Sequence, residues 1–147
     1  MNSIIFVCTS NTCRSPIASA LAIKYLQDHD NNEKYKVISR ALTDAYEPEG
    51  SQASYNGIEV MKNDYNIDIS HHRSKLLDDN DMNNAYKVIA VSRSHYNEIV
   101  RRYPNYVSKI TTLAEDVTDP WHQPIEIYKQ TAITLSKLIN DIMITIT

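Results

Sequence analysis

Cys8 and Arg14, near the start of the chain, are two side chains whose types and spacing suit phosphate chemistry. Five residues separate the thiol from the guanidinium, so one tight loop can bring both groups to a single bound anion. A thiolate is a nucleophile that can attack phosphorus, and a planar guanidinium fork binds two oxygens of an oxyanion. The pair therefore predicts a site in which Cys8 attacks a phosphoryl group that Arg14 holds.

The segments on either side of this loop favour the same interpretation. Residues 4–7 form a short apolar run, typical of a strand buried on both faces of a parallel sheet. After the loop we expect a helix with Ser15 as N-cap and Pro16 as its first residue. The loop then lies at a helix N-terminus, where free N–H groups and the helix dipole attract anions and favour a thiolate. A buried structural cysteine beside a capping loop is the alternative for Cys8.

The rest of the chain predicts alternating strands and helices. We expect further strands at residues 35–39, 86–91 and 109–113, and further helices at residues 51–63, 92–100 and 125–143. In the last helix, apolar residues recur every three or four positions, which is typical of an amphipathic helix. This order predicts a single three-layer α/β domain over residues 1–147, with helices on both faces of a parallel sheet.

A carboxylate that could complete the site follows the fourth expected strand. Asp119 precedes Pro120 and Trp121 in a loop at the carboxyl end of the sheet, where ligands bind in such folds. One carboxyl group can protonate a leaving atom and later activate a water molecule. Trp121, with Tyr46, is expected to form a wall for the substrate. An ordinary Asp-Pro turn is the alternative for Asp119.

The composition limits the classes of function. The 147 residues are 42% apolar and 22% charged, as in one globular domain. A net charge of −3 provides no broad basic surface for nucleic acid, and no apolar run is long enough to span a bilayer or to act as a signal sequence. The only cysteines, Cys8 and Cys13, would close a ring too small for a structural disulfide. We therefore expect a reduced, cytoplasmic monomer that binds neither nucleic acid nor membrane.

Residues 7–16, Val-Cys-Thr-Ser-Asn-Thr-Cys-Arg-Ser-Pro, resemble the signature of the low-molecular-weight protein tyrosine phosphatases. The likeness extends over essentially the whole chain. It implies a four-stranded parallel sheet, no metal or other cofactor, a phosphorylated protein as substrate, and hydrolysis through a phosphocysteine. It also implies that Cys8 is the nucleophile, Arg14 the phosphate clamp and Asp119 the general acid. The implied phosphate-binding residues are Thr9, Ser10, Asn11, Thr12, Cys13 and Ser15.

Four further positions are interpreted through this resemblance. Ser10 replaces a family glycine, and it would strain the loop if that position requires a positive φ. Asn11 matches a family asparagine in the left-handed conformation, which asparagine tolerates. Ser39 and His71 match family positions that hydrogen-bond the loop through Asn11, and His72 is the alternative to His71.

Cys13 is expected to have a redox role. Family members use this pair of cysteines to protect the nucleophile, because a thiolate beside a resolving cysteine is oxidised reversibly to a disulfide. A Cys13 that only packs in the loop is the alternative.

The resemblance leaves the substrate open. We take phosphotyrosine as the first interpretation, although Trp121 would stack on a phenyl ring or on a guanidinium plane. Protein-arginine phosphatases are a close alternative, because their loop carries threonine, here Thr12, where tyrosine phosphatases commonly carry isoleucine. Residues 125–131 also resemble that bacterial branch.

Two further alternatives are less consistent with the sequence. Arsenate reductases coupled to thioredoxin have a related loop but need additional cysteines, and none follows Cys13 here. A phosphate-binding module without turnover is supported by Ser10 alone.

Overall fold

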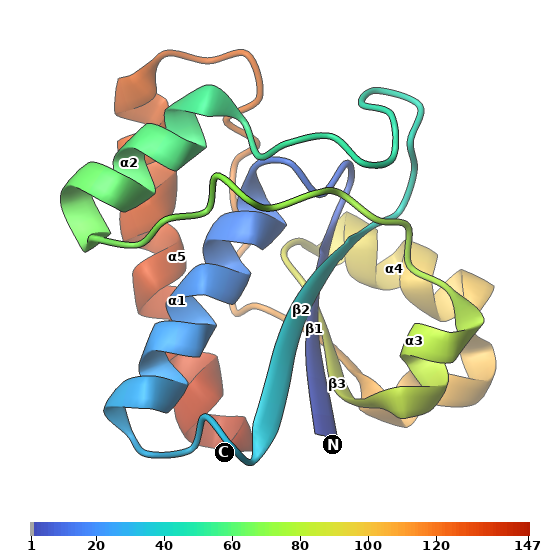
Figure 1. The fold of residues 1–147 in the computed structure, drawn as a ribbon. Coiled ribbons are helices and arrows are strands. Elements are labelled where there is room, and N and C mark those ends of the chain that lie inside the picture. Colours follow the sequence, from blue (N-terminus) through green and yellow to red (C-terminus); the bar gives the residue numbers. More distant parts are fainter. Residues whose placement is uncertain (1) are drawn as a thin grey trace.

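Four parallel strands form one sheet in the computed structural model, which describes residues 2–147 (Figure 1). Their order in the sheet is β2-β1-β3-β4. Both neighbours of β1 run parallel to it, and every residue of β1 from Ser3 to Cys8 is buried. The predicted four-stranded parallel sheet with a doubly covered first strand is therefore confirmed. The strands are β1 (Asn2–Cys8), β2 (Tyr35–Ala41), β3 (Ala85–Ala90) and β4 (Ile110–Thr112).

Helices cover both faces of the sheet. Helices α1, α2 and α5 lie on one side of the strands, and α3 and α4 lie on the other (Figure 1). Alternate residues of β1 supply the two cores: Ile4 and Phe6 pack in the first, and Ile5 and Val7 in the second. The helices are α1 (Arg14–Asp28), α2 (Tyr55–Tyr65), α3 (Asp79–Asn84), α4 (Arg93–Arg102), the 3₁₀ helix η1 (Pro104–Lys109) and α5 (Ile125–Ile146).

The start of α1 differs from the sequence prediction. The helix begins at Arg14 with Cys13 as N-cap, so the assignment of Ser15 as N-cap is wrong. The Ser15 hydroxyl bonds side chains of the preceding loop instead of capping the helix. Pro16 is the third helical residue rather than the first, and its missing N–H costs little because the first four N–H groups lack intrahelical partners.

Helix α2 begins at Tyr55 rather than at residue 51. The preceding residues are held extended, because Ser74 N donates to the Ser51 carbonyl at 2.8 Å and Ser51 N donates to Ser74 Oγ at 3.0 Å. Helices α3 and η1 were not predicted. None of the helices within residues 2–147 is long and apolar enough to cross a membrane.

Candidate active site

A cavity of about 280 Å³ opens at the carboxyl end of β1. Residues of three separate segments surround it: the loop between β1 and α1, the segment after β2, and the segment before α5. The predicted nucleophile, clamp, acid and substrate wall all contribute to this one cavity. The lining residues are Cys8, Thr9, Ser10, Thr12, Cys13, Arg14, Tyr46, Asp119 and Trp121.

The backbone of the loop between β1 and α1 turns its carbonyl groups outward. The carbonyls of Cys8 and Thr9 both accept from Leu42 N at 3.0 Å, and the Thr12 carbonyl accepts from the N-cap residue of α2 at 2.9 Å. No oxygen among residues 2–147 accepts a hydrogen bond from the backbone N–H groups of residues 9–13. These N–H groups are therefore free to bind an anion at the N-terminus of α1, where the helix dipole strengthens the attraction.

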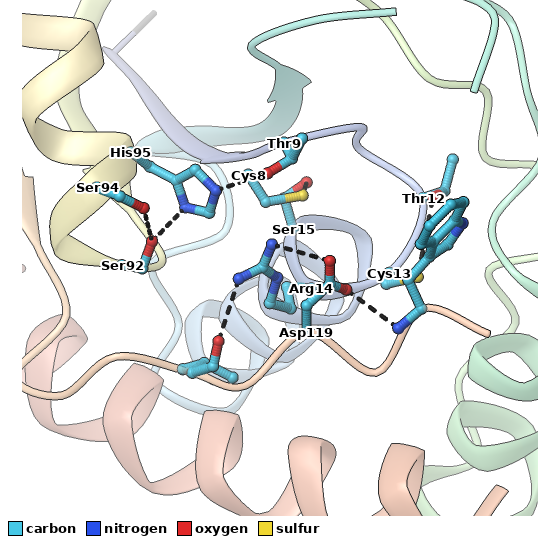
Figure 2. Close-up of polar contacts among 12 residues, drawn as sticks. Cys8, Thr9, Thr12, Cys13, Arg14, Ser15, Ser92, Ser94, His95 and Asp119 are labelled. Carbon is cyan, nitrogen blue, oxygen red and sulfur yellow. Dashed lines mark hydrogen bonds and ion pairs between the residues drawn. The ribbon is translucent and has the colours of Figure 1, made fainter. Parts of the chain in front are cut away.

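Arg14 is buried, and its guanidinium is only partly paired (Figure 2). Nη1 donates to the Val117 carbonyl at 3.1 Å, and Nη2 lies 3.5 Å from Asp119 Oδ2. Nε is a buried nitrogen without a hydrogen-bond partner among residues 2–147. Because an unpaired buried N–H is costly, this side of the fork is suited to an oxyanion that accepts from Nε and Nη2 together.

The Cys8 thiol receives a hydrogen bond whose direction follows from its neighbours. Lys75 N donates to Asn11 Oδ1 at 3.1 Å, which fixes the side-chain amide of Asn11 with its NH₂ group toward Ser15 and Ser39. Asn11 Nδ2 donates to both hydroxyl oxygens at 2.8 Å. Ser15 Oγ is 3.0 Å from Cys8 Sγ and keeps its own proton free for the sulfur. Such a bond stabilises a thiolate, both as nucleophile and as leaving group.

The backbone angles of the loop test two of the expectations. Asn11 has a φ of 60°, so the left-handed conformation predicted for it is present. Ser10 is not among the residues with positive φ in residues 2–147. The strain that a positive φ would impose on serine therefore does not arise, and the loop is compatible with serine at this position.

The histidine that supports the loop is His72 and not His71. His72 Nε2 donates to the Asn11 carbonyl at 2.7 Å, whereas the His71 side chain is exposed. Burial lowers the pKa of His72 below its usual range. The choice of His71 was wrong by one residue, because the turn that follows α2 carries two adjacent histidines and no periodic pattern sets their register.

Asp119 is held close to the clamp residue. Its Oδ1 accepts from Trp121 N at 3.1 Å, and its Oδ2 faces Arg14. The side chain is 45% exposed, so it can reach both the solvent and a bound substrate. Asp116 has a different role, since its Oδ1 accepts from Arg93 N at 2.7 Å at the start of α4.

The aromatic wall is assembled from two loops. The ring of Tyr46 contacts the ring of Trp121 edge-on, with 6.0 Å between centroids. The ring of His122 stacks on Trp121, with 3.8 Å between centroids. Trp121 Nε1 donates to Glu47 Oε1 at 3.0 Å. Glu47 was not predicted as a site residue, and its contact with Trp121 links the segment after β2 to the loop of Asp119.

Cys13 borders the cavity, but its thiol contacts side chains outside the loop. Its Sγ is 3.4 Å from Ser54 Oγ and 3.5 Å from Tyr128 Oη, and burial raises the pKa of the Cys13 thiol. To form a disulfide with Cys8, its sulfur would have to leave these contacts. The redox role stays a prediction, and mass spectrometry for a Cys8–Cys13 link after mild peroxide treatment is the measurement that decides it.

His95 is a buried residue near the site that the sequence analysis missed (Figure 2). Its Nε2 is 2.9 Å from Thr9 Oγ1, and its Nδ1 is 2.7 Å from Ser92 Oγ. Burial, and then the nearby positive charge of Arg14, lower the pKa of His95 to about 4. The Ser-x-x-His spacing at the start of a helix that follows a buried strand was the available signal, because residues three apart share a helix face.

The chain combines a parallel α/β sheet with a cysteine loop at the end of β1, and an arginine fork and a carboxylate lie beside this loop. These features are typical of the class of proteins that bind phosphate through a cysteine loop. Among residues 2–147, no group of three or more His, Cys, Asp or Glu side chains could hold a metal ion. The chain belongs to the low molecular weight phosphotyrosine protein phosphatase family, whose model matches residues 3–147.

Individual relatives carry different names. A protein-arginine-phosphatase of Geobacillus stearothermophilus is 33% identical over 93% of this chain and 90% of its own. An arsenate reductase of Bacillus cereus is 33% identical over 74% of this chain and 71% of its own. A crystal structure of a low molecular weight protein tyrosine phosphatase from T. tengcongensis has a TM-score of 0.89, with 38% identity over 99% of both chains.

Proposed function

We propose that this chain is a protein phosphatase that hydrolyses phosphoarginine through a covalent phosphocysteine on Cys8. Thr12 is the observation that supports this proposal most directly. It is buried in the cavity wall, and protein-arginine phosphatases resemble this chain in having threonine at that position of the loop. The relative of that name over nearly the whole chain supports phosphoarginine better than the phosphotyrosine taken first from the sequence.

In the first step, the Cys8 thiolate attacks phosphorus while Arg14 and the loop N–H groups hold the phosphoryl oxygens. A sulfur–phosphorus bond forms and the phosphorus–nitrogen bond breaks, and the electron pair goes to the guanidino nitrogen. Asp119 supplies the proton that this nitrogen needs to leave as neutral or cationic arginine. Hydrogen bonds from preorganised donors stabilise the transferring group, which is the main contribution of a protein to phosphoryl transfer.

In the second step, a water molecule attacks the phosphocysteine. The Asp119 carboxylate accepts a proton from this water, the sulfur–phosphorus bond breaks, and orthophosphate leaves. Cys8 departs as a thiolate. A hydrogen bond from the Ser15 hydroxyl stabilises this thiolate, with 3.0 Å between Ser15 Oγ and Cys8 Sγ. The reaction requires a free thiol at Cys8, and we propose that the protein acts in a reducing cytoplasm, where thiols stay unpaired.

The cavity walls favour a guanidinium over a phenyl ring. Thr12 has a hydroxyl where the family's isoleucine has only carbon, and this hydroxyl lies 3.8 Å from Cys13 Sγ. The Asp119 carboxylate bonds the backbone N–H of Trp121, and the Glu47 carboxylate bonds the edge of its ring at Nε1. A guanidinium that stacks on the Trp121 ring in the cavity is attracted by both carboxylates, whereas a phenyl ring gains the stacking alone.

Phosphotyrosine is the second candidate substrate. The observation that favours it is the aromatic wall of Trp121 and Tyr46, together with the 38% identity to a structure named as a tyrosine phosphatase. The two candidates share the chemistry at Cys8, so they differ only in how the cavity receives the leaving group.

Thr12→Ile tests the proposed basis of substrate choice. We expect the ratio of phosphotyrosine to phosphoarginine kcat/KM to rise by about 10- to 200-fold, because one apolar or hydroxyl contact typically discriminates on that scale. Thr145→Ile, on the exposed surface of α5, is the matched control and should leave the ratio unchanged. An unchanged ratio in Thr12→Ile would mean that Thr12 does not select the substrate.

A further inference from the structure

His95 is a buried titratable side chain that the proposed reaction does not use. It lies on α4, on the opposite face of the sheet from α1, yet its ring contacts the loop that holds Cys8 (Figure 2). The ring reaches Thr9, the residue that follows Cys8 and lines the cavity. His95 therefore connects the two layers of the protein at the point where the anion would bind.

The ring of His95 can join its two neighbours in only two ways. Neutral imidazole has one N–H donor and one bare acceptor nitrogen, and burial keeps this ring neutral near neutral pH. If Nε2 carries the proton, it donates to Thr9 Oγ1 and Nδ1 accepts from Ser92. If Nδ1 carries the proton, it donates to Ser92 and the Thr9 hydroxyl gives its own proton to Nε2.

Two observations favour a proton on Nε2. Ser94 Oγ is 3.1 Å from Ser92 Oγ and can donate to it, which leaves the Ser92 proton for Nδ1. The Thr9 hydroxyl also borders a cavity built for an anion. An anion favours hydroxyl protons that point toward it, and this requires Thr9 to accept from the ring.

We propose that His95 is a positioning residue that directs the hydroxyl proton of Thr9 into the cavity, toward the phosphoryl oxygens or the Cys8 thiolate. The order of donors is Ser92 to His95, His95 to Thr9, and Thr9 to the anion. The proposal rests on the proposed phosphate chemistry at Cys8, but it does not depend on which phosphorylated residue is the substrate.

The tautomer of His95 is the direct test. Two-bond ¹H–¹⁵N NMR spectra of the wild-type protein with saturating inorganic phosphate should show a proton on Nε2 and a bare Nδ1. A proton on Nδ1 with a bare Nε2 in the phosphate-bound protein would overturn the proposal, because Thr9 would then donate to the ring.

Kinetics with para-nitrophenyl phosphate provide the second readout. His95→Leu should lower kcat/KM by about 10- to 100-fold, the scale of one hydrogen bond to a charged group. His95→Gln should restore most of this loss, because an amide can donate to Thr9 and accept from Ser92. Equal losses in the two variants would contradict the proposal. In the Thr9→Val background, His95→Leu should cause no further loss.

Ser92→Ala keeps the test decisive if His95→Leu does not fold. This variant leaves the imidazole in place but removes the donor to Nδ1, so it should lower kcat/KM only where the Thr9 hydroxyl is present. An equal effect of Ser92→Ala in the wild-type and Thr9→Val backgrounds would count against the proposal. The Nε2–H tautomer in phosphate-bound protein supports this inference even if phosphoarginine proves not to be hydrolysed, which separates it from the proposed function.

Discussion

At the scale of single residues, the site uses a few charged groups with incomplete pairing. Arg14 has one buried nitrogen without a hydrogen-bond partner among residues 2–147, and its contact with Asp119, at 3.5 Å, is long for a hydrogen bond. A bound oxyanion would accept a hydrogen bond from the unpaired Arg14 nitrogen, and it would replace Asp119 as the partner of Nη2. The Asp119 carboxyl would then be free to turn toward the leaving nitrogen, where a general acid is required.

Asp119→Asn should slow turnover of phosphoarginine by about 10²- to 10⁴-fold, the usual scale for a positioned acid–base group. An aryl phosphate whose phenol leaves easily should show a smaller loss, because its leaving oxygen needs little protonation. Steady-state kcat with both substrates is the measurement. Asp116→Asn is the matched control, since Asp116 bonds the start of α4. If the control rather than Asp119→Asn loses activity, the general acid has been misassigned.

Among the residues of the site, the sequence was sufficient for those that are defined by a local motif. Cys8, Arg14 and Asp119 were found because each belongs to a short motif at or after the carboxyl end of a strand. The supporting residues are set by long-range contacts, so a local pattern could not select His72 over His71 or reveal that His95 reaches Thr9 across the sheet. Glu47 was missed for the same reason, because its partner is 74 positions away.

At the scale of elements, two loops share the wall of the cavity. The segment after β2 carries Tyr46 and Glu47, and the loop before α5 carries Asp119 and Trp121. The direct contacts between these segments are the Glu47–Trp121 hydrogen bond and the edge contact of Tyr46 with Trp121. Because Tyr46 is 62% exposed, the hydrogen bond is the contact that fixes the wall.

Glu47→Leu should raise KM by about 2- to 10-fold with little change in kcat, the scale of one net hydrogen bond. The wall would lose its fixed position, while the groups that bind phosphate would stay in place. Trp121 is the only tryptophan, so its fluorescence should also change in the variant. Glu115→Gln is the control, because it removes a nearby exposed charge without contacting Trp121. A variant with unchanged KM and fluorescence would show that Glu47 does not hold the wall.

The prediction of elements succeeded where apolar periodicity was strong and failed where polar contacts decide. Strand β1 and helix α5 were recognised from their apolar patterns. Helix α3 has six mostly polar residues, and a capping box between Asp78 and Asp81 holds it. Helix α1 starts earlier than Ser15 because the loop uses that hydroxyl for Cys8 and Asn11.

At the scale of the whole molecule, the anion site lies between two cores and within a chain of net charge −3. We therefore expect the attraction for phosphate to be local and to come from loop N–H groups, the start of α1 and one arginine. His95 belongs to the same region, and its neutrality has a consequence for stability. Burial and Arg14 lower its pKa, whereas the nearby Asp119 and Asp116 carboxylates act in the opposite direction.

The wild-type protein should lose stability relative to His95→Gln as the pH falls from 6.5 to 4. The unfolded chain protonates His95 near its usual pKa, but the folded protein resists until about pH 4. Unfolding then takes up a proton across this interval, so lower pH favours the unfolded state. The difference in unfolding free energy should change by about 3 kcal/mol. Urea unfolding of both proteins at several pH values measures it, and a constant difference would show that folding does not lower the pKa of His95.

Hydrolysis of phosphoarginine at Cys8 is the reaction that we propose for the whole molecule. The most direct measurement is kcat/KM on two peptides of one sequence that differ only in carrying phosphoarginine or phosphotyrosine at the same position. Cys8→Ala is the background control for both, because its methyl group cannot act as a nucleophile. We expect the wild type to prefer phosphoarginine by about tenfold or more, the scale of the contact attributed to Thr12. Equal turnover of the two peptides, or faster turnover of phosphotyrosine, would contradict it.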